Sequence, residues 1–282
     1  MALVFFPCWD TPENGRTALT RATLDSLWYT LNPSLHRLIV VDNGSCLETA
    51  HLLREAQSAG QALDIITNDR NRGVAYACNQ VLERRQPGEI VIKMDNDVHF
   101  RRGGWADDLV ACIEREPLIG ICGLKRKDEK WWPLVGPDND GIARPSESRF
   151  IALPHEPGQR WLAVEKTPWL LVGTCIALNP AFLDAVGGFW HPSGQYGHED
   201  TILAARCRAA GFWSCYWPWV EIDHIDPMAD DAYARWKAQD ASDFAQEAVA
   251  ACNDILTGKR GYFFPIELDK TNSARSLINP LQ

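Results

Sequence analysis

Short apolar runs alternate with amphipathic segments over the first 123 residues. The apolar runs show little period-two alternation, which is typical of strands buried on both faces of a sheet. The segments between them place apolar residues at helical spacing, as at Leu24, Leu27, Trp28 and Leu31. We predict strands over 3–6, 38–41, 63–67, 89–94 and 119–123, and helices around 24–31, 47–59, 74–84 and 105–115. This alternation favours an α/β fold with a mostly parallel sheet and helices on both faces.

The pattern changes after residue 124. Residues 125–168 are rich in Pro, Gly and charge, which predicts a long excursion or a small antiparallel subregion. Pro180 at a first helical position and Gly187-Gly188 bound a short helix. Regular structure is predicted to resume over 169–178. The later predicted elements are a helix over 201–210, strands near 212–217 and 220–224, a helix over 229–256 and an irregular arm from 258. We expect one domain over 1–226, with halves at 1–124 and 125–226, and an extension over 227–282.

Polar groups follow three of the predicted parallel strands. They lie at residues 42–45, 71–73 and 95–97. In parallel α/β sheets the ligand binds beyond the carboxyl ends of the strands. All three segments are therefore expected along one rim of the sheet.

Residues 95–97 and two segments later in the chain carry candidate chemistry. Asp95 and Asp97, one residue apart, can converge on Mg²⁺ or Mn²⁺, or they can cap the next helix and form turns. Glu199 and Asp200 can complement a helix dipole, or one of them can act as a general base. His224 ends a predicted strand and is either a ligand or a structural residue.

Composition and charge exclude several classes of protein. Apolar residues are 46% and charged residues 23% of the 282, which excludes a disordered, collagen-like or coiled-coil chain. The net charge of −9 argues against general nucleic-acid binding. None of the nine cysteines forms a C-x-x-C pair, so we expect small buried side chains in a reducing compartment. No signal peptide or membrane span is recognised, which predicts a cytoplasmic protein.

The order of the motifs resembles the inverting glycosyltransferases of family 2, which have the GT-A fold. The resemblance rests on five segments in the same order: 40–45, 71–79, 93–97, 172–174 together with 187–189, and 198–200. It covers residues 1 to 226 approximately. The first loop, over 8–16, departs from the Thr-x-Asn-Arg pattern that is common in the family.

This resemblance implies a role for each matching residue. Asp200 would be the general base, Glu199 would orient acceptor or donor, and Asp97, His224 and Asp95 would hold Mn²⁺ or Mg²⁺. The remaining nucleotide-sugar contacts, with UDP-sugar as the expected donor, would be Pro7, Asp42, Asn71, Arg72, Gly73, Asn79, Asp95, Asn96, Gly173 and Thr174. For the acceptor side we name Trp132, Trp169, Trp190 and His198, although core packing explains each tryptophan equally well.

Other functions compete with this reading. A nucleotidyltransferase usually carries a Gly-rich loop after the first strand, and residues 7–16 hold one Gly. A non-catalytic sugar-nucleotide or glycan binder is a second alternative. The acceptor is expected to be a glycan, a lipid-linked glycan or a small molecule. A hydroxylated DNA base is a further alternative, suggested by Arg84-Arg85, Arg101-Arg102 and residues 125–127. The C-terminal arm, which contains residues 262–265, can pack on its own domain or on a second subunit, as in a homodimer.

Overall fold

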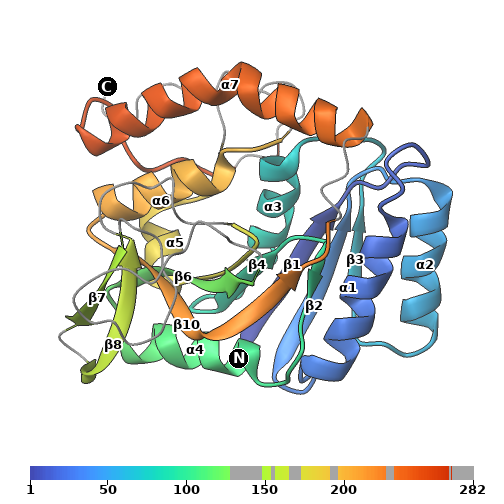
Figure 1. The fold of residues 1–282 in the computed structure, drawn as a ribbon, viewed down its shortest axis with the longest axis horizontal. Helices are drawn as coiled ribbons and strands as arrows, with labels where there is room; N and C mark the ends of the chain where they lie inside the picture. Colours follow the sequence, from blue (N-terminus) through green and yellow to red (C-terminus); the bar gives the residue numbers. More distant parts are fainter. Residues whose placement is uncertain are drawn as a thin grey trace.

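The computed structural model describes residues 1–127, 148–153, 156–164, 173–190, 196–226, 232–266 and 268. It is an α/β structure with one curled mixed sheet between two layers of helices (Figure 1). The strand order is β3-β2-β1-β4-β9-β6-β10-β8-β7, and β5 pairs with β10. The described helices include none that is long and apolar enough to cross a membrane.

Four parallel strands form one half of the sheet. They are β3 (Asp64–Thr67), β2 (His36–Asp42), β1 (Ala2–Cys8) and β4 (Ile90–Met94). Alternate side chains of β1 enter different cores, Leu3 and Phe5 on one face and Val4 and Phe6 on the other. The sequence prediction of strands buried on both faces is therefore confirmed.

The other half of the sheet is mixed. Strand β9 (Cys175–Leu178) runs antiparallel between β4 and β6 (Ile119–Arg126), and β10 (Trp213–His224) runs parallel to β6. An antiparallel pair, β7 (Ser148–Leu153) and β8 (Glu156–Val164), adds to β10, which confirms an antiparallel subregion within 125–168. Strand β5 (Val98–His99), which the sequence did not predict, pairs with the end of β10.

One strand replaces the two that were predicted over 212–217 and 220–224. The sequence is interrupted by Pro218, which has no amide hydrogen to donate to a ladder. Strand β10 continues through this point, with an irregular register against β6 between Trp217 and Glu221.

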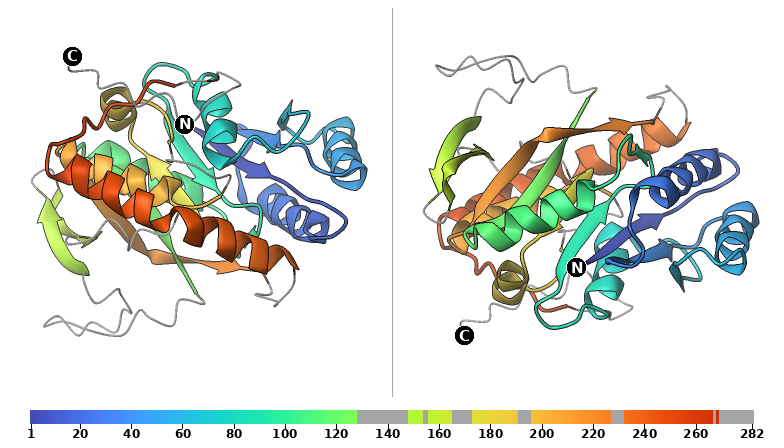
Figure 2. Two further views of the ribbon diagram at one scale, coloured as in Figure 1. Left: turned by 90° about the horizontal axis from the view of Figure 1, so that it is seen from above. Right: turned by 90° about the horizontal axis from the view of Figure 1, so that it is seen from below.

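Six helices cover the two faces of the sheet (Figures 1 and 2). One face carries α1 (Thr17–Thr30), α2 (Leu47–Ser58) and α4 (Trp105–Arg115). The other carries α3 (Val74–Leu82), α5 (Pro180–Val186) and α6 (Glu199–Ala209). Helix α7 (Ala232–Leu256) packs outside α6 and shares a small core with it. The boundary predicted at 226 therefore separates two segments that pack together, and as a domain boundary it stays a prediction.

The short helix α5 shows why its ends were readable. The side chain of Asn179 accepts a hydrogen bond from the Ala181 amide at 2.8 Å, and Pro180 occupies the first turn. Gly187 ends the helix with φ of 79°, a conformation that favours glycine. A Cβ there would also lie 1.9 Å from the Phe264 carbonyl oxygen.

A buried guanidinium fastens the segment after α7 to this turn. Arg206 donates to the carbonyl oxygens of Val186, Gly188 and Tyr262 and lies 4.7 Å from the Phe264 ring centroid. Burial lowers the pKa of Arg206 to about 9. Three backbone acceptors thus hold this cation.

Candidate active site

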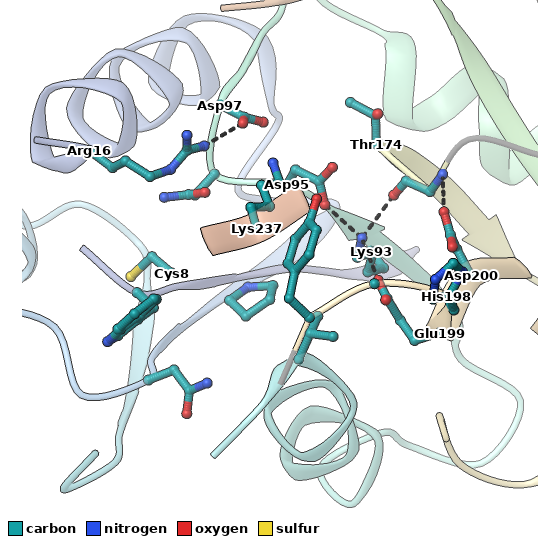
Figure 3. Close-up of a pocket in the computed structure, with 18 of the residues that line it drawn as sticks. Cys8, Arg16, Lys93, Asp95, Asp97, Thr174, His198, Glu199, Asp200 and Lys237 are labelled. Carbon is teal, nitrogen blue, oxygen red and sulfur yellow. Dashed lines mark hydrogen bonds and ion pairs between the residues drawn. The ribbon is translucent and has the colours of Figure 1, made fainter. Parts of the chain in front are cut away.

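A cavity of about 470 Å³ lies at the rim where the polar segments were expected (Figure 3). This volume is within the range of small-ligand sites. Its wall combines the ends of β1 and β4, the turn before β9, the start of α6, the end of β10 and the first turns of α7. The lining includes eleven of the predicted residues, namely Pro7, Asn71, Asp95, Asn96, Asp97, Gly173, Thr174, His198, Glu199, Asp200 and His224.

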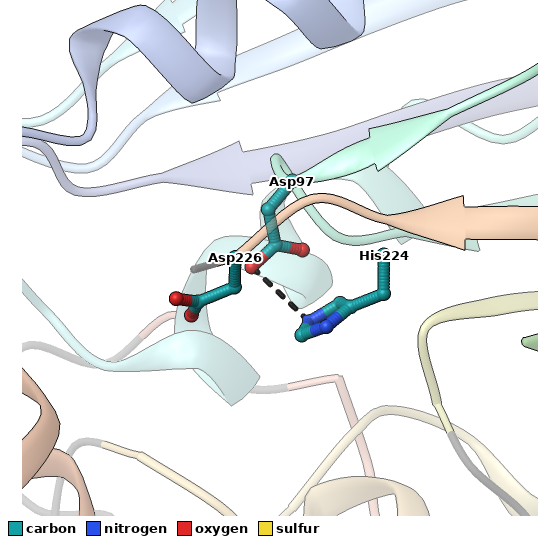
Figure 4. A group of neighbouring side chains, drawn as sticks. All are labelled: Asp97, His224 and Asp226. Carbon is teal, nitrogen blue, oxygen red and sulfur yellow. Dashed lines mark ion pairs between the residues drawn. The ribbon is translucent and has the colours of Figure 1, made fainter. Parts of the chain in front are cut away.

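One wall includes Asp97 and His224, which form a group of candidate cation ligands with the neighbouring Asp226 (Figure 4). One ligand atom from each lies within 4.8 Å of the others. His224 Nε2 is 3.4 Å from Asp97 Oδ2, and Arg16 bridges the carboxylates of Asp97 and Asp226. Burial opposes the charge of Asp97, but His224 and Arg16 outweigh it and hold the pKa of this carboxyl well below its usual range.

These residues fit a divalent cation. Asp97 Oδ1 is buried and has no hydrogen-bond partner among the described residues. A buried carboxylate oxygen normally has a partner, so this atom is available as a ligand. Mn²⁺ binds sets of carboxylate oxygens together with an imidazole nitrogen, and Mg²⁺ binds carboxylate oxygens.

The opposite wall centres on a buried lysine. Lys93 Nζ lies 2.6 Å from Asp95 Oδ1, 2.9 Å from the Gly173 carbonyl oxygen and 3.7 Å from Glu199 Oε1. Burial disfavours its charge, but Asp95 and Glu199 outweigh this and raise the pKa of Lys93. Burial, and to a smaller extent repulsion from Asp200, raises the pKa of Glu199 to about 7.

Asp200 lies beside this lysine cluster at the start of α6. Its Oδ2 accepts a hydrogen bond from the Gly173 amide at 2.9 Å, and its Oδ1 accepts one from the Thr201 amide at 2.7 Å. A Cβ on Gly173 would lie 2.7 Å from Asp200 Cβ, so this contact requires glycine. Helix α6 begins at Glu199, two residues before the predicted start at Thr201, which puts both carboxylates in its first turn.

His198 precedes α6 in a strained conformation. Within the described ranges it is the one non-glycine residue with a positive φ, 66°. Such conformations cost free energy and gather at functional sites. His198 lines the cavity, which fits this tendency. The sequence prediction placed it on the acceptor side.

The side of the cavity assigned to the nucleotide is built from amides. Asn43 Nδ2 donates to Asn71 Oδ1 at 3.0 Å, and Asn43 Oδ1 accepts from Asn68 Nδ2 at 2.9 Å. Arg72 donates its backbone amide to Asn43 Oδ1 at 3.2 Å, while its guanidinium pairs with Asp69. The network fixes the loop after β3 against the loop after β2.

Five predicted residues do not line the cavity: Asp42, Arg72, Gly73, Asn79 and Trp190. Asp42 Oδ1 accepts from the Ser45 amide at 2.8 Å within its own turn. The carboxamide of Asn79 bonds to the amide and carbonyl of Phe189, at 2.7 and 3.0 Å.

Trp190 stacks on Phe264 with ring centroids 4.9 Å apart and is buried, as its core-packing alternative predicted. Trp132 and Trp169 lie outside the described residues.

Asn96 supports the turn between the two aspartates. Its Nδ2 donates to Asp10 Oδ1 at 3.0 Å and to Thr20 Oγ1 at 2.8 Å, and its carbonyl oxygen accepts from Thr23 Oγ1 at 2.9 Å. The side chain is therefore anchored to α1 and the loop before it. These contacts place Asp95 and Asp97 toward different walls of the cavity.

Sequence reasoning missed several lining residues: Trp9, Arg16, Asn43, Lys93, Arg126, Tyr196, Trp236 and Lys237. Helix α7 supplies two of them. Trp236 packs edge-on against Trp9 at 5.0 Å, and Lys237 Nζ lies 4.7 Å from the Tyr196 ring centroid. A charged or aromatic residue in an amphipathic helix gives no sign that it reaches a distant loop. The lysine in Lys93-Met94-Asp95 was the readable signal, because a cation inside an apolar strand needs a partner.

Two solved structures share this fold. The mannosyltransferase PcManGT from Pyrobaculum calidifontis, solved with GDP-Man and Mn²⁺, is 18% identical with a TM-score of 0.62, covering 98% of this chain and 72% of that one. TarS 1–349 of S. aureus, solved with UDP-GlcNAc, is 16% identical with a TM-score of 0.57, covering 92% of this chain and 71% of that one. The GT-A fold that the resemblance implied is confirmed.

A curated relative and a family model match the sequence itself. The uncharacterized protein y4gI of Sinorhizobium fredii (strain NBRC 101917 / NGR234) is 23% identical over 260 residues. The match covers 82% of this chain, which spans only 28% of the length of that relative. The family model described as glycosyl transferase family 2 matches residues 15–160, just over half of the chain. The chain therefore belongs to glycosyl transferase family 2.

Proposed function

We propose that this protein is an inverting glycosyltransferase that moves a sugar from a nucleoside-diphosphate sugar to an acceptor hydroxyl. The observation that carries the proposal is the pairing of two features across one cavity. Asp97, His224 and Asp226 form a cation-ligand set with a buried unpartnered oxygen, and Asp200 presents a carboxylate on the other wall. Transfer from a diphosphate needs both charge stabilisation and a base.

Asp97 and His224, with Asp226 beside them, would hold Mn²⁺ or Mg²⁺. When bound, the cation would stabilise negative charge on the departing diphosphate. Arg16 retains one oxygen of each carboxylate, which keeps their positions fixed. Asp95 remains a candidate ligand or ribose contact, with its Oδ1 held by Lys93.

Asp200 would take the proton of the acceptor hydroxyl as that oxygen attacks the anomeric carbon. The amides of Gly173 and Thr201 fix the direction of the carboxylate. A single displacement with one base inverts the anomeric centre. Glu199, buried against Lys93, would support this wall, and His198 would contact the acceptor.

The amide-rich side of the cavity supports a nucleotide-sugar donor. Asn43 and Asn71 meet there beside Pro7 and Trp9, which offers hydrogen bonds and an aromatic ring to a base and ribose. UDP-sugar is the first candidate, and the likeness to PcManGT adds GDP-mannose. For the acceptor we propose a glycan, a lipid-linked glycan or a small molecule, with a hydroxylated DNA base as the alternative.

Nucleotide release from a panel of UDP-, GDP- and dTDP-sugars tests the proposal. We expect slow hydrolysis of one donor with Mn²⁺ or Mg²⁺, and none with EDTA. Asp97→Ala should lose the metal-dependent hydrolysis, and Asp200→Asn should lose turnover. Asp25 is an exposed residue of α1, so the control Asp25→Asn should match the wild type. NMR of the transferred product then reports the anomeric configuration.

Each outcome separates the competing functions. Nucleotide binding without turnover on any acceptor would favour a non-catalytic binder. Absence of nucleotide binding would overturn the donor site. Retention of configuration in the product would overturn the role of Asp200 as the base of a single displacement.

A further inference from the structure

A buried lysine connects three segments that are far apart in the sequence. Lys93 comes from β4, Gly173 from the turn before β9, and Glu199 from the first turn of α6. The Lys93 side chain is 3% exposed, so its ammonium exchanges nearly all of its water for these protein contacts. The ammonium donates hydrogen bonds to Asp95 Oδ1 and to the Gly173 carbonyl oxygen, and it forms an ion pair with Glu199 Oε1 at 3.7 Å (Figure 3).

The contact with Gly173 reaches the base. Lys93 holds the carbonyl oxygen of Gly173, and the amide of the same residue donates to Asp200 Oδ2 at 2.9 Å. The next residue is held too, because the Asp95 amide donates to the Thr174 carbonyl oxygen at 2.9 Å. The backbone of residues 173 and 174 is therefore held by two contacts from the end of β4, and it connects that end to Asp200.

Charge balance explains why this position holds a cation. Asp95, Glu199 and Asp200 bring three carboxyl groups to one wall, and Glu199 is buried. Buried like charges repel strongly in a low-dielectric interior. An apolar side chain at position 93 would leave the carbonyl of Gly173 without this donor and would remove the positive charge that faces Asp95 and Glu199.

We infer that Lys93 is a positioning residue for the transfer reaction, which orients the Asp200 carboxylate through the Gly173 peptide and holds Glu199 beside it. This inference rests on the proposed function for its kinetic consequence. Its structural consequence, a fixed 173–174 peptide, stands without it.

Lys93→Met tests the inference with a side chain of similar length and no charge. We expect kcat for donor hydrolysis to fall about 100-fold, the cost of misplacing a reacting group by roughly 1 Å, with little change in KM. Deuterium uptake should rise in peptides that contain residues 173–178, and stay unchanged in α2. The matched control is Lys125→Met on β6, a lysine that pairs with Glu221 and lies outside the cavity wall.

The two readouts separate failure of the inference from failure of the proposed function. If the wild type turns over no donor, exchange at 173–178 still decides, and unchanged uptake in Lys93→Met overturns the inference. An unchanged kcat, a loss confined to KM, or an equal loss in Lys125→Met would also overturn it. If Lys93→Met does not fold, Lys93→Gln keeps a hydrogen-bond donor without the charge and is judged by the same measurements.

Discussion

Replacing Gly173 with alanine probes the contact between the turn before β9 and the base. A Cβ on Gly173 would lie 2.7 Å from both Cβ and Oδ2 of Asp200. Unbonded carbon atoms settle about 3.5–4.0 Å apart, so Asp200 or the turn must move by roughly 1 Å. That movement also breaks the 2.9 Å hydrogen bond from the Gly173 amide to Asp200.

A displacement of this size costs about 100-fold in kcat, or roughly 3 kcal/mol of transition-state stabilisation. Overpacking costs a further 1–3 kcal/mol, approximately, in the free energy of unfolding. Nucleotide affinity should not change, because the Asn43 and Asn71 network lies on another wall. Calorimetric titration with UDP or GDP, beside the nucleotide-release assay, measures the two quantities separately.

Gly103→Ala is the matched control. Its Cβ would lie 3.7 Å from the Thr30 carbonyl oxygen, an ordinary contact, and neither glycine has φ in the left-handed region. We expect wild-type kcat from this variant. A folded Gly173→Ala protein that keeps its kcat would refute the reasoning, because Asp200 would then tolerate displacement and could not be the positioned base.

Three further predictions concern charge. At a Mn²⁺ concentration of a hundred times Kd, binding should stabilise the wild type by about 2.7 kcal/mol, and Asp97→Asn should abolish this stabilisation. A Mn²⁺-dependent rise in Tm that persists in Asp97→Asn would contradict the cation site. Glu199 has a pKa raised to about 7 from 4.5, so its stabilising contribution is present below pH 4.5 and is lost as the pH rises to 7. Over that range the free energy of unfolding of the wild type should fall by roughly 3 kcal/mol relative to that of Glu199→Gln. A difference between the two proteins that stays constant from pH 4.5 to 8, measured by urea unfolding, would contradict this. Arg206→Met should lower the free energy of unfolding by roughly 3 kcal/mol and speed proteolysis near Tyr262, because the buried carbonyls of Val186 and Gly188 and the carbonyl of Tyr262 lose their donor; an unchanged digestion rate would count against that anchor.

Much of the fold was readable because its signals are local. Apolar runs gave the parallel strands, and Asn179, Pro180 and Gly187 gave the ends of α5. The rim followed from one rule, that polar segments after parallel strands share an edge. The direction of β9 was not readable, since four buried residues in a row show no orientation.

The site was readable only as far as its motifs reached. Asp97 and Asp200 belong to segments that resemble the family, and they line the cavity together with His224. Asn79 belongs to such a segment too, yet its carboxamide bonds to Phe189, because a polar residue on a helix face can serve the core as well as a ligand. Lys237 was out of reach, because its role depends on how α7 crosses the cavity.

The place of β9 in the sheet has a consequence for how the chain folds during synthesis. Strand β4 pairs with β1 on one side and with β9 on the other, and Met94 meets Cys175 across that second edge. Strand β6 has β9 and β10 as its two neighbours, and both come later in the chain. A nascent chain that has passed residue 127 but not 175 thus carries one open edge on β4 and two on β6. Open strand edges are templates for aggregation, so the interval before β9 emerges is when this fold most needs protection by chaperones.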